Sequence, residues 1–284
     1  MGDRKHHSER SQLALEIHKP IRHKFPRRKV MVSGIDHVWA SDLVEMSPER
    51  GFKYILTIVD VFSKFGWAIP LKSKTGIEMT ETFEKILKES GRVPKKIWSD
   101  KGKEYYNKIF LKFLKDHSIE LYSVESEIKC SVAERFNRTL KEMMYRKFTE
   151  LESNSDSGRS PKWVKLLPEL VNEYNHRVHS TIKMTPIDGS KKESEEQIRR
   201  DVFSITGTSK PPKYKIGDFV RIYKYKNLFE KGYIGRWTKE VFQISEVLRT
   251  NPVTYNIMDE DGEVIKGGFY EQELLKSEFD FEKN

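Results

Sequence analysis

The spacing of apolar and polar residues predicts strands in the first part of the chain. Residues 36–46, DHVWASDLVEM, alternate in such a way that one face is apolar except for a single carboxylate. That face carries Val38, Ala40, Asp42, Val44 and Met46. Residues 53–62, KYILTIVDVF, and 65–71, FGWAIPL, are two further strands separated by a short turn. Together the three strands predict an antiparallel meander.

The period then changes to that of helices. Residues 77–90 and 107–117 place apolar side chains at helical spacing, and a long helix is predicted from about 131 to 148. Short strands are predicted between them at 95–100 and 120–126. The order strand, strand, strand, helix, strand, helix, strand, helix is typical of an α/β layer arrangement with a mixed sheet flanked by helices.

The second part of the chain has a different character. Residues 152–162 form a polar loop and 163–178 a further helix, while the composition of 188–213 predicts a linker. From Tyr214 onward short strand patterns succeed one another, with a hairpin signal at DEDG. This pattern predicts a small all-β barrel of SH3 type.

These patterns divide the chain into five regions. We expect a basic N-terminal arm, an α/β core, a helical extension with a linker, an SH3-like C-terminal module and a short tail. Their bounds are 1–33, 34–150, 151–212, 213–276 and 277–284.

Charge points to a polyanionic partner. The net charge is +9, and residues 1–33 alone carry nine Lys and Arg against three acidic residues. A basic arm of this kind suits nucleic acid, although a basic tail is often only a solvated tail. The single cysteine, Cys130, excludes an internal disulfide and zinc sites built on paired cysteines. No membrane span and no secretory signal are visible, so we expect an intracellular protein.

Three carboxylates are candidates for chemistry. Asp42 lies among apolar neighbours in a strand, where burying its charge is costly unless it is paired or bound to a metal. An edge strand with this face in water is the alternative. Asp100 ends the strand at 95–100, and an Asp-Lys-Gly turn is an equally simple reason for its presence. Glu134 lies on the long helix, on the side opposite its apolar stripe, where it can also be a solvated partner of Arg138.

The order of the elements favours convergence of these three side chains. The strand of Asp42 can lie beside the strand that ends at Asp100, and the helix of Glu134 can pack across that end. Three carboxylates without a nearby cysteine favour a hard cation, Mg²⁺ or Mn²⁺. Two such ions would activate the attacking oxygen and stabilise the leaving oxygen of a phosphoryl transfer. Lys101 and Lys103 would then face phosphates.

Four ordered segments carry a resemblance to a known family. ASDLVEM, VDVFSKFGWAIPL, IWSDKGKEY and SVAERFNRTLKEMM resemble the integrase catalytic core of retroviruses and retroelements. The stretch EYNHRVHSTIKMTPIDG is similar to the segment after the catalytic helix in that family, and the C-terminal residues resemble the Maverick/Polinton transposon integrases.

The resemblance implies an RNase H-like fold, and metal-dependent 3′-end processing and strand transfer of DNA. It implies that Asp42, Asp100 and Glu134 are catalytic metal ligands for two ions, Asp42 bridging both. It maps DNA contacts onto Arg138 and Lys141. We therefore expect a transposon-derived integrase that acts as a homo-oligomer on DNA, in the nucleus.

The chain departs from the family pattern in three ways. Thirty-three residues lie between Asp100 and Glu134, where the family usually has about 35, so a shortened loop is expected around 124–130. Ser131 stands where the family often has glycine. The family's N-terminal zinc module needs cysteines that this chain lacks, so no zinc module is expected.

Two rival functions stay open on the sequence. A catalytically silent, domesticated DNA-binding protein would bind metal without strand transfer. An RNase H-like nuclease would prefer RNA–DNA hybrids, whereas the C-terminal module favours a duplex.

Overall fold

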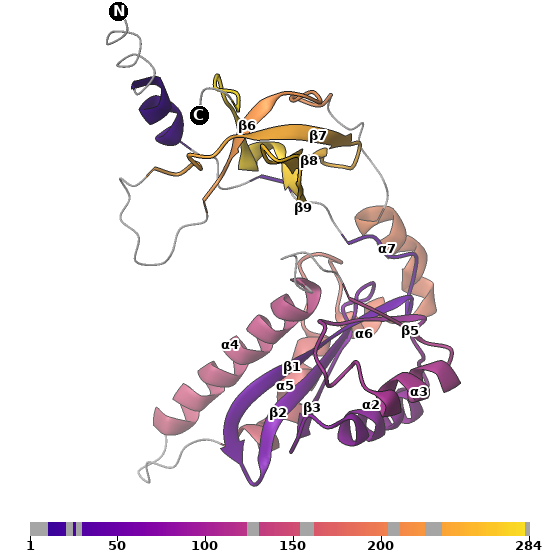
Figure 1. Ribbon diagram of the computed structural model, residues 1–284. Helices are drawn as coiled ribbons and strands as arrows, with labels where there is room; N and C mark the ends of the chain where they lie inside the picture. The colour runs from indigo at the N-terminus through magenta and orange to yellow at the C-terminus, as the bar shows by residue number, and fades with distance from the viewer. Residues whose placement is uncertain are drawn as a thin grey trace, which may run out of the picture. The chain divides into compact units, whose positions relative to one another are not determined.

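The computed structural model describes residues 11–20, 25–26, 30–123, 131–153, 162–203, 211–224 and 235–281. It divides into two compact units. One is Val30–Ile205, and the other joins the two ends of the chain, Met1–Lys29 and Thr206–Asn284 (Figure 1). Within the described ranges, no helix combines the length and the apolar character that a bilayer span requires.

The first unit is built on a five-stranded sheet with the order β3-β2-β1-β4-β5. The first three strands are antiparallel, while β4 is parallel to both β1 and β5. This confirms the predicted meander and the mixed sheet. The strands are β1 (Val38–Glu49), β2 (Phe52–Asp60), β3 (Gly66–Leu71), β4 (Lys96–Trp98) and β5 (Glu120–Tyr122).

The register of the two central strands brings two predicted site residues to the same level. Ala40 of β1 is aligned with Trp98 of β4, and the two strands run in the same direction. Two residues further along each chain stand Asp42 and Asp100. A parallel register therefore puts both carboxylates at one end of β4, the carboxyl end at which α/β sheets place their sites.

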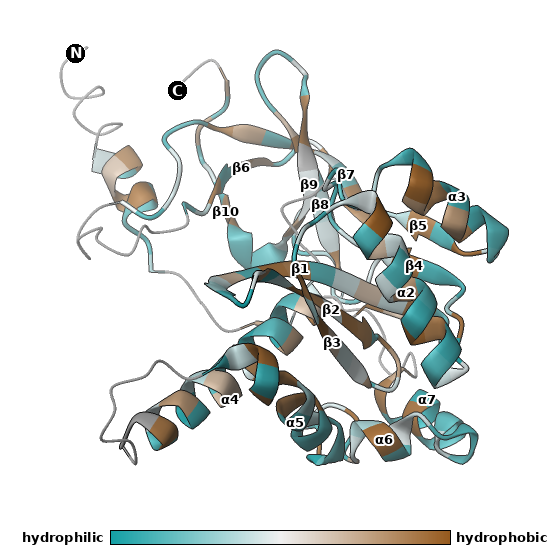
Figure 2. Ribbon diagram, turned by 90° about the horizontal axis from the view of Figure 1, so that it is seen from below, coloured by the Kyte–Doolittle hydropathy of each residue, from teal (hydrophilic) through white to brown (hydrophobic). Residues whose placement is uncertain are grey.

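Alternation along the strands gives the sheet two apolar faces, each covered by helices. Helices α2 (Gly76–Ser90) and α3 (Lys108–Asp116) bury Phe83 and Phe110 against one face, in a core that includes Trp39. Helices α4 (Ser131–Ser153) and α5 (Trp163–His176) cover the other face, in the core that contains Ala40. Figure 1 shows the two helix pairs on either side of the strands, and Figure 2 shows hydrophobic residues along β2 and on the sides of α3 and α5. Asp42 lies on the α4 side.

The linker predicted over 188–213 is wrong for most of its first half. Residues Pro186–Gly189 form α6, Lys192–Ser194 form a 3₁₀ turn, and Glu195–Val202 form α7. Ile198 and Val202 belong to the core on the α4 side. This helix packs through one apolar pair at i and i+4. The charged residues around the pair made the segment resemble a linker in the sequence. Residues 204–210 of the predicted linker lie outside the described residues.

The C-terminal part of the second unit is the predicted all-β module. It is a five-stranded antiparallel sheet with the order β10-β6-β7-β8-β9. Tyr214, Val220, Ile244, Tyr255 and Leu274 are buried in its core. The strands are β6 (Phe219–Ile222), β7 (Phe242–Leu248), β8 (Thr254–Met258), β9 (Val264–Tyr270) and β10 (Leu274–Lys276), with the 3₁₀ turn Glu271–Glu273 before the last.

The N-terminal segment is part of the same unit, which the basic composition of 1–33 did not indicate. Residues 11–17 are helical, and Glu16 forms a buried ion pair at 2.7 Å with Arg221 of β6. Glu16 also accepts hydrogen bonds from Ser277 and from the backbone N–H of Glu278. A buried pair of this kind fixes the geometry of the contact, because leaving either charge alone in the interior is costly.

Candidate active site

Asp42 occupies the centre of the candidate site. It lies on β1, half-buried, and its carboxylate accepts a hydrogen bond at 2.8 Å from the N–H of Leu43. Burial raises the pKa of the Asp42 carboxyl above its usual range, and the negative charges of Asp100 and Glu134 raise it further. Asp42 therefore lies near enough to Asp100 and to Glu134 to be influenced by the charge of each.

Asp100 comes after the last residues of β4 and is exposed. Its side chain accepts a hydrogen bond at 3.2 Å from the N–H of Gly102, so the Asp-Lys-Gly turn expected as the simple alternative is present. Its carbonyl oxygen accepts hydrogen bonds from the hydroxyls of Ser99 and Ser123, at 2.9 and 3.1 Å. Asp100 therefore caps this turn and also acts with its charge on Asp42.

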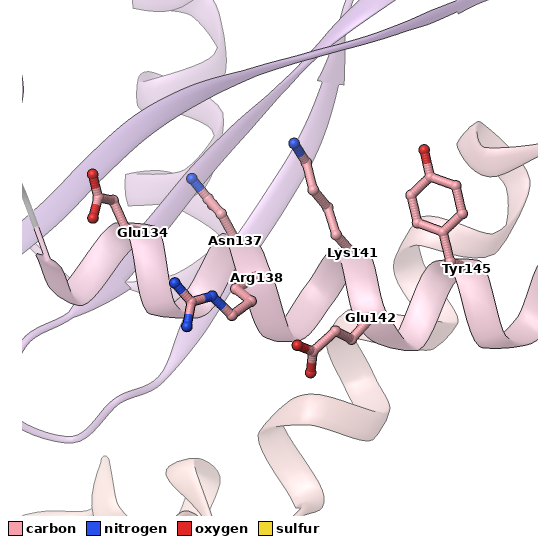
Figure 3. Close-up of a pocket in the computed structure, with 6 residues that line it drawn as sticks. All are labelled: Glu134, Asn137, Arg138, Lys141, Glu142 and Tyr145. Carbon is pink, nitrogen blue, oxygen red and sulfur yellow. The ribbon is translucent and has the colours of Figure 1, made fainter. Parts of the chain in front are cut away.

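Glu134 stands in the first turn of α4, with its side chain exposed. It lines an open depression that runs along this helix. Figure 3 shows its carboxylate on the same side of the helix as the side chains of Asn137, Lys141 and Tyr145, while Arg138 and Glu142 point to the other side. The three residues that were predicted to share one face, Glu134, Arg138 and Lys141, all line this depression.

Asn137 is the residue of this site that the sequence reasoning missed. It is 8% exposed, and its amide Nδ2 donates a hydrogen bond at 2.7 Å to Asp42. Its Oδ1 is buried and has no hydrogen-bond partner among the described residues. An unpaired buried acceptor is unusual enough in a folded protein to indicate a missing donor. The available signal was position, since Asn137 lies three residues after Glu134 on a helix and therefore on the same side.

A second pair of residues supports Asp42 from behind. The hydroxyls of Ser41 and Tyr105 share a hydrogen bond at 2.8 Å, and both residues are buried. Burial raises the pKa of the Tyr105 phenol well above its usual value, and the negative charges of Asp42 and Asp100 add to this shift. The hydrogen bond ties the strand that carries Asp42 to the segment between β4 and α3.

The donor set fits a hard divalent cation in its chemistry. The carboxylates supply oxygen ligands, the type that Mg²⁺ and Mn²⁺ prefer, and the principal charges acting on Asp42 are negative. The unpaired Oδ1 of Asn137 is suited to accept a hydrogen bond from a metal-bound water. In their present rotamers, no three His, Cys, Asp or Glu side chains of the described ranges are grouped as a finished metal site.

The predicted DNA-contact cations surround this site without forming one cluster. Lys101 and Lys103 are exposed in the loop after Asp100. Arg138 and Lys141 are exposed on α4 and line the same depression as Glu134. All four remain predictions as DNA contacts.

Asp60 does not belong to the site. Its buried carboxylate accepts hydrogen bonds from the Ser63 hydroxyl at 2.5 Å and from the N–H of Phe62 at 3.2 Å, and it pairs with Arg92 at 3.0 Å. Asp60 therefore caps the turn that contains Ser63. Cys130 and the expected shortened loop at 124–130 lie outside the described residues, whereas Ser131 is the first residue of α4.

Comparison with known proteins shows the family to which this fold belongs. The sequence profile of the integrase core domain family matches residues 34–125. A transposon-derived protein of Caenorhabditis elegans is 32% identical over 225 residues, which cover 79% of this chain and 72% of that protein. The chain belongs to the integrase core domain family. The narrower resemblance to Maverick/Polinton integrases stays a prediction.

Viral relatives and a solved structure agree with this assignment. The Gag-Pol polyprotein of avian reticuloendotheliosis virus is 30% identical over 140 residues, which cover 46% of this chain and 11% of the polyprotein. The fold also resembles a chain from the intasome of simian T-cell lymphotropic virus, solved in complex with PP2A regulatory subunit B56 gamma. That match has a TM-score of 0.62 at 17% identity and covers 93% of this chain and 86% of the other. It supports the RNase H-like integrase fold that the sequence motifs implied.

Proposed function

We propose that this protein is a transposon-derived DNA integrase, a polynucleotidyl transferase that processes DNA 3′ ends and joins them to a target duplex. The observation that carries the proposal is the parallel register of β1 and β4, which brings Asp42 and Asp100 to the same level, together with the hydrogen bond from Asn137 that joins the helix of Glu134 to Asp42. Membership of the integrase core domain family supports the same reaction class.

The carboxylates of Asp42, Asp100 and Glu134 would hold two Mg²⁺ or Mn²⁺ ions. When bound, such ions activate an attacking oxygen and stabilise a leaving oxygen in phosphoryl transfer. Asn137 would orient the Asp42 carboxylate through its 2.7 Å hydrogen bond. Lys101, Lys103, Arg138 and Lys141 would hold the phosphates of the DNA strand near these carboxylates, because phosphate contacts fix the register of a duplex.

We further propose that the working form is a homo-oligomer on DNA in the nucleus. Pairing two DNA ends needs more than one copy, and the excess of basic residues in 1–33 suits binding to DNA or nuclear targeting. Light scattering of the protein with and without paired duplex ends would test the assembly.

The reaction is tested with branched oligonucleotides that imitate a strand-transfer product, because resolving such a branch requires no knowledge of the element's end sequence. The wild type is assayed with Mg²⁺ and with Mn²⁺ beside Asp100→Asn and Glu134→Gln. We expect resolution by the wild type alone, with all three proteins folded by circular dichroism. Tight DNA binding without resolution in any of them would contradict the proposal and favour the silent DNA-binding protein, and preferential cleavage of RNA–DNA hybrids would favour the nuclease.

A further inference from the structure

The face of α4 that carries Glu134 continues for about one more turn beyond Lys141, the last of the predicted phosphate contacts, and there it carries an exposed aromatic side chain. Tyr145 is 61% exposed, and it lines the same open depression as Glu134 and Lys141. Figure 3 shows the three side chains on one side of the helix. Neither the sequence motifs nor the carboxylate site gives Tyr145 a function.

The ring of Tyr145 is held in place although it is exposed. Phe148 packs against it edge-on, with ring centroids 5.6 Å apart and an interplanar angle of 70°. Phe148 is itself packed against the core on the α4 side of the sheet. One edge of the tyrosine ring is thus supported while much of its surface meets solvent. Among the residues that the structure describes, its hydroxyl has no hydrogen-bond partner. An ordered aromatic ring of this kind needs little further ordering to bind a ligand.

The spacing along α4 suits a DNA strand that starts at the carboxylates. Tyr145 lies eleven residues after Glu134, which at ~1.5 Å per residue is about 16 Å along the helix axis. Phosphates of one strand of a duplex are ~3.4 Å apart along the DNA axis. A strand that runs along α4 would therefore reach Tyr145 about five nucleotides from the phosphate at the carboxylates, with Lys141 contacting it between the two.

A neighbouring cation favours DNA as the occupant of this face. The depression is lined by cations and acids in equal number, Arg138 and Lys141 against Glu134 and Glu142. Lys141 lies about one helical turn before Tyr145, and Figure 3 shows both side chains on one side of the helix. Nucleic-acid-binding proteins combine cations, which contact phosphates, with aromatic rings, which pack against the nucleotides. An isolated exposed tyrosine needs no explanation, but this one continues a row that starts at the candidate site.

We propose that Tyr145 is a DNA-contact residue that positions the reacting strand about five nucleotides from the cleaved phosphate. Its ring packs against a deoxynucleotide, and its hydroxyl donates a hydrogen bond to a phosphate of that strand. This inference rests on the proposed function, since it takes the strand at Glu134 to be DNA.

The test uses the full-length chain and branched DNA in which single phosphates of the reacting strand are replaced, one at a time, by uncharged methylphosphonates. Affinity is measured by fluorescence anisotropy, and branch resolution is measured with Mn²⁺. The variants are Tyr145→Phe, Tyr145→Ala and, as a control, Arg146→Ala. Arg146 is exposed on the next position of α4 and therefore lies ~100° around the helix.

In the wild type we expect one replaced phosphate, about five nucleotides from the reacting one, to weaken binding about tenfold, the size of a hydrogen bond to a charged group. Tyr145→Phe should lose this sensitivity at that position and keep it elsewhere, while Tyr145→Ala should weaken binding a further ~5-fold through loss of the ring. Arg146→Ala should keep the position-specific effect.

Three outcomes would overturn the inference. One is an unchanged interference pattern in both Tyr145 variants. The second is the same loss of pattern in Arg146→Ala. The third is a change of oligomeric state in Tyr145→Ala without any change of pattern, which would assign the ring to a contact between copies. A wild-type protein that binds the DNA with the expected pattern but resolves no branch would contradict the proposed reaction and leave the Tyr145 contact standing.

Discussion

Two aspartates on neighbouring strands of the same sheet have surroundings of opposite charge. Asp60, at the end of β2, is fully buried and meets a cation supplied by the chain, the guanidinium of Arg92 at 3.0 Å. Asp42, on β1, is half-buried, and the principal charges around it are carboxylates. Burial raises the pKa of both side chains. The difference lies in the partner: the chain completes the surroundings of Asp60 and leaves those of Asp42 to be completed from outside.

The hydrogen bonds around the two residues show the same division. Arg92 is itself held by Asp36 at 2.6 Å, and its guanidinium lies 4.9 Å from the centre of the Trp67 ring. Asp60 therefore belongs to a closed cluster that fixes the β2–β3 turn. Around Asp42, by contrast, Asn137 keeps a buried oxygen without a partner among the described residues. An unpaired acceptor beside negative charges fits the proposed metal site, whereas the closed cluster is structural.

The largest expected effect is on activity. Asp100→Asn and Glu134→Gln should each lower branch resolution about 10³-fold, since several kcal/mol of transition-state stabilisation depend on the carboxylates and their metal. The control is Asp116→Asn on α3, which removes an exposed carboxylate paired with Lys112 and should keep full activity. Rates are compared per folded protein. Loss of activity in Asp116→Asn to the same degree would show that the effect is not confined to this site.

Next in size is the stability of the closed cluster. Asp60→Asn should lower the free energy of unfolding by about 3 kcal/mol, because it leaves the poorly solvated Arg92 with one carboxylate fewer. Urea denaturation monitored by circular dichroism measures this loss. Asp42→Asn, which removes one of three mutually repelling charges, should not lower the stability of the metal-free protein. Equal destabilisation by the two substitutions would remove the distinction between the two aspartates.

A smaller effect is expected from Asn137. Asn137→Ala should weaken Mn²⁺ binding about tenfold, since groups that orient a ligand typically change metal affinity by that factor or more. Calorimetric titration of the metal is the direct measurement. The matched control is Thr139→Ala on the same helix. It removes a hydroxyl that donates a hydrogen bond to the carbonyl oxygen of Arg135. An Asn137→Ala protein with wild-type metal affinity would limit that residue to packing.

The smallest effect is on the pH dependence of stability. The pKa of Asp42 is raised in the folded protein, so its contribution to stability is fully present below the ordinary aspartate pKa and is lost as pH rises through the raised value. Asp42→Asn carries no charge at any pH and lacks this loss. Without metal, the variant should therefore gain stability relative to the wild type as the pH rises from the ordinary aspartate pKa through the raised one. A constant difference between the two proteins across this range would contradict the raised pKa.

Much of the first unit could be predicted because its signals are periodic and local. Alternation gave β1 to β3, and the period of 3.6 gave α2 to α4, since each of these elements buries one face. The predictions were weaker where packing was decided by few residues. Helix α7 docks through Ile198 and Val202 within a charged run, and residues 11–17 dock through a buried ion pair with a strand more than 200 positions away.

The candidate site was predicted in part, for a related reason. Asp42 could be selected because it breaks the apolar face of its strand, whereas Asp100 and Glu134 were selected through the order of the elements and the resemblance to the integrase family. The parallel register of β1 and β4 then brings Asp42 and Asp100 level. Asn137 breaks no pattern. Its role depends on how α4 is rotated against β1, which the residue spacing on one helix does not determine.

The most direct test of the difference between the two aspartates is to count bound Mn²⁺ by electron paramagnetic resonance, at neutral pH, in the wild type, Asp42→Asn and Asp116→Asn. The account predicts that the wild type and Asp116→Asn bind the ion to the same extent, while Asp42→Asn with an intact fold binds little or none. Equal binding by Asp42→Asn and the wild type would contradict it, because the charge at Asp42 would then have no need of a cation from outside.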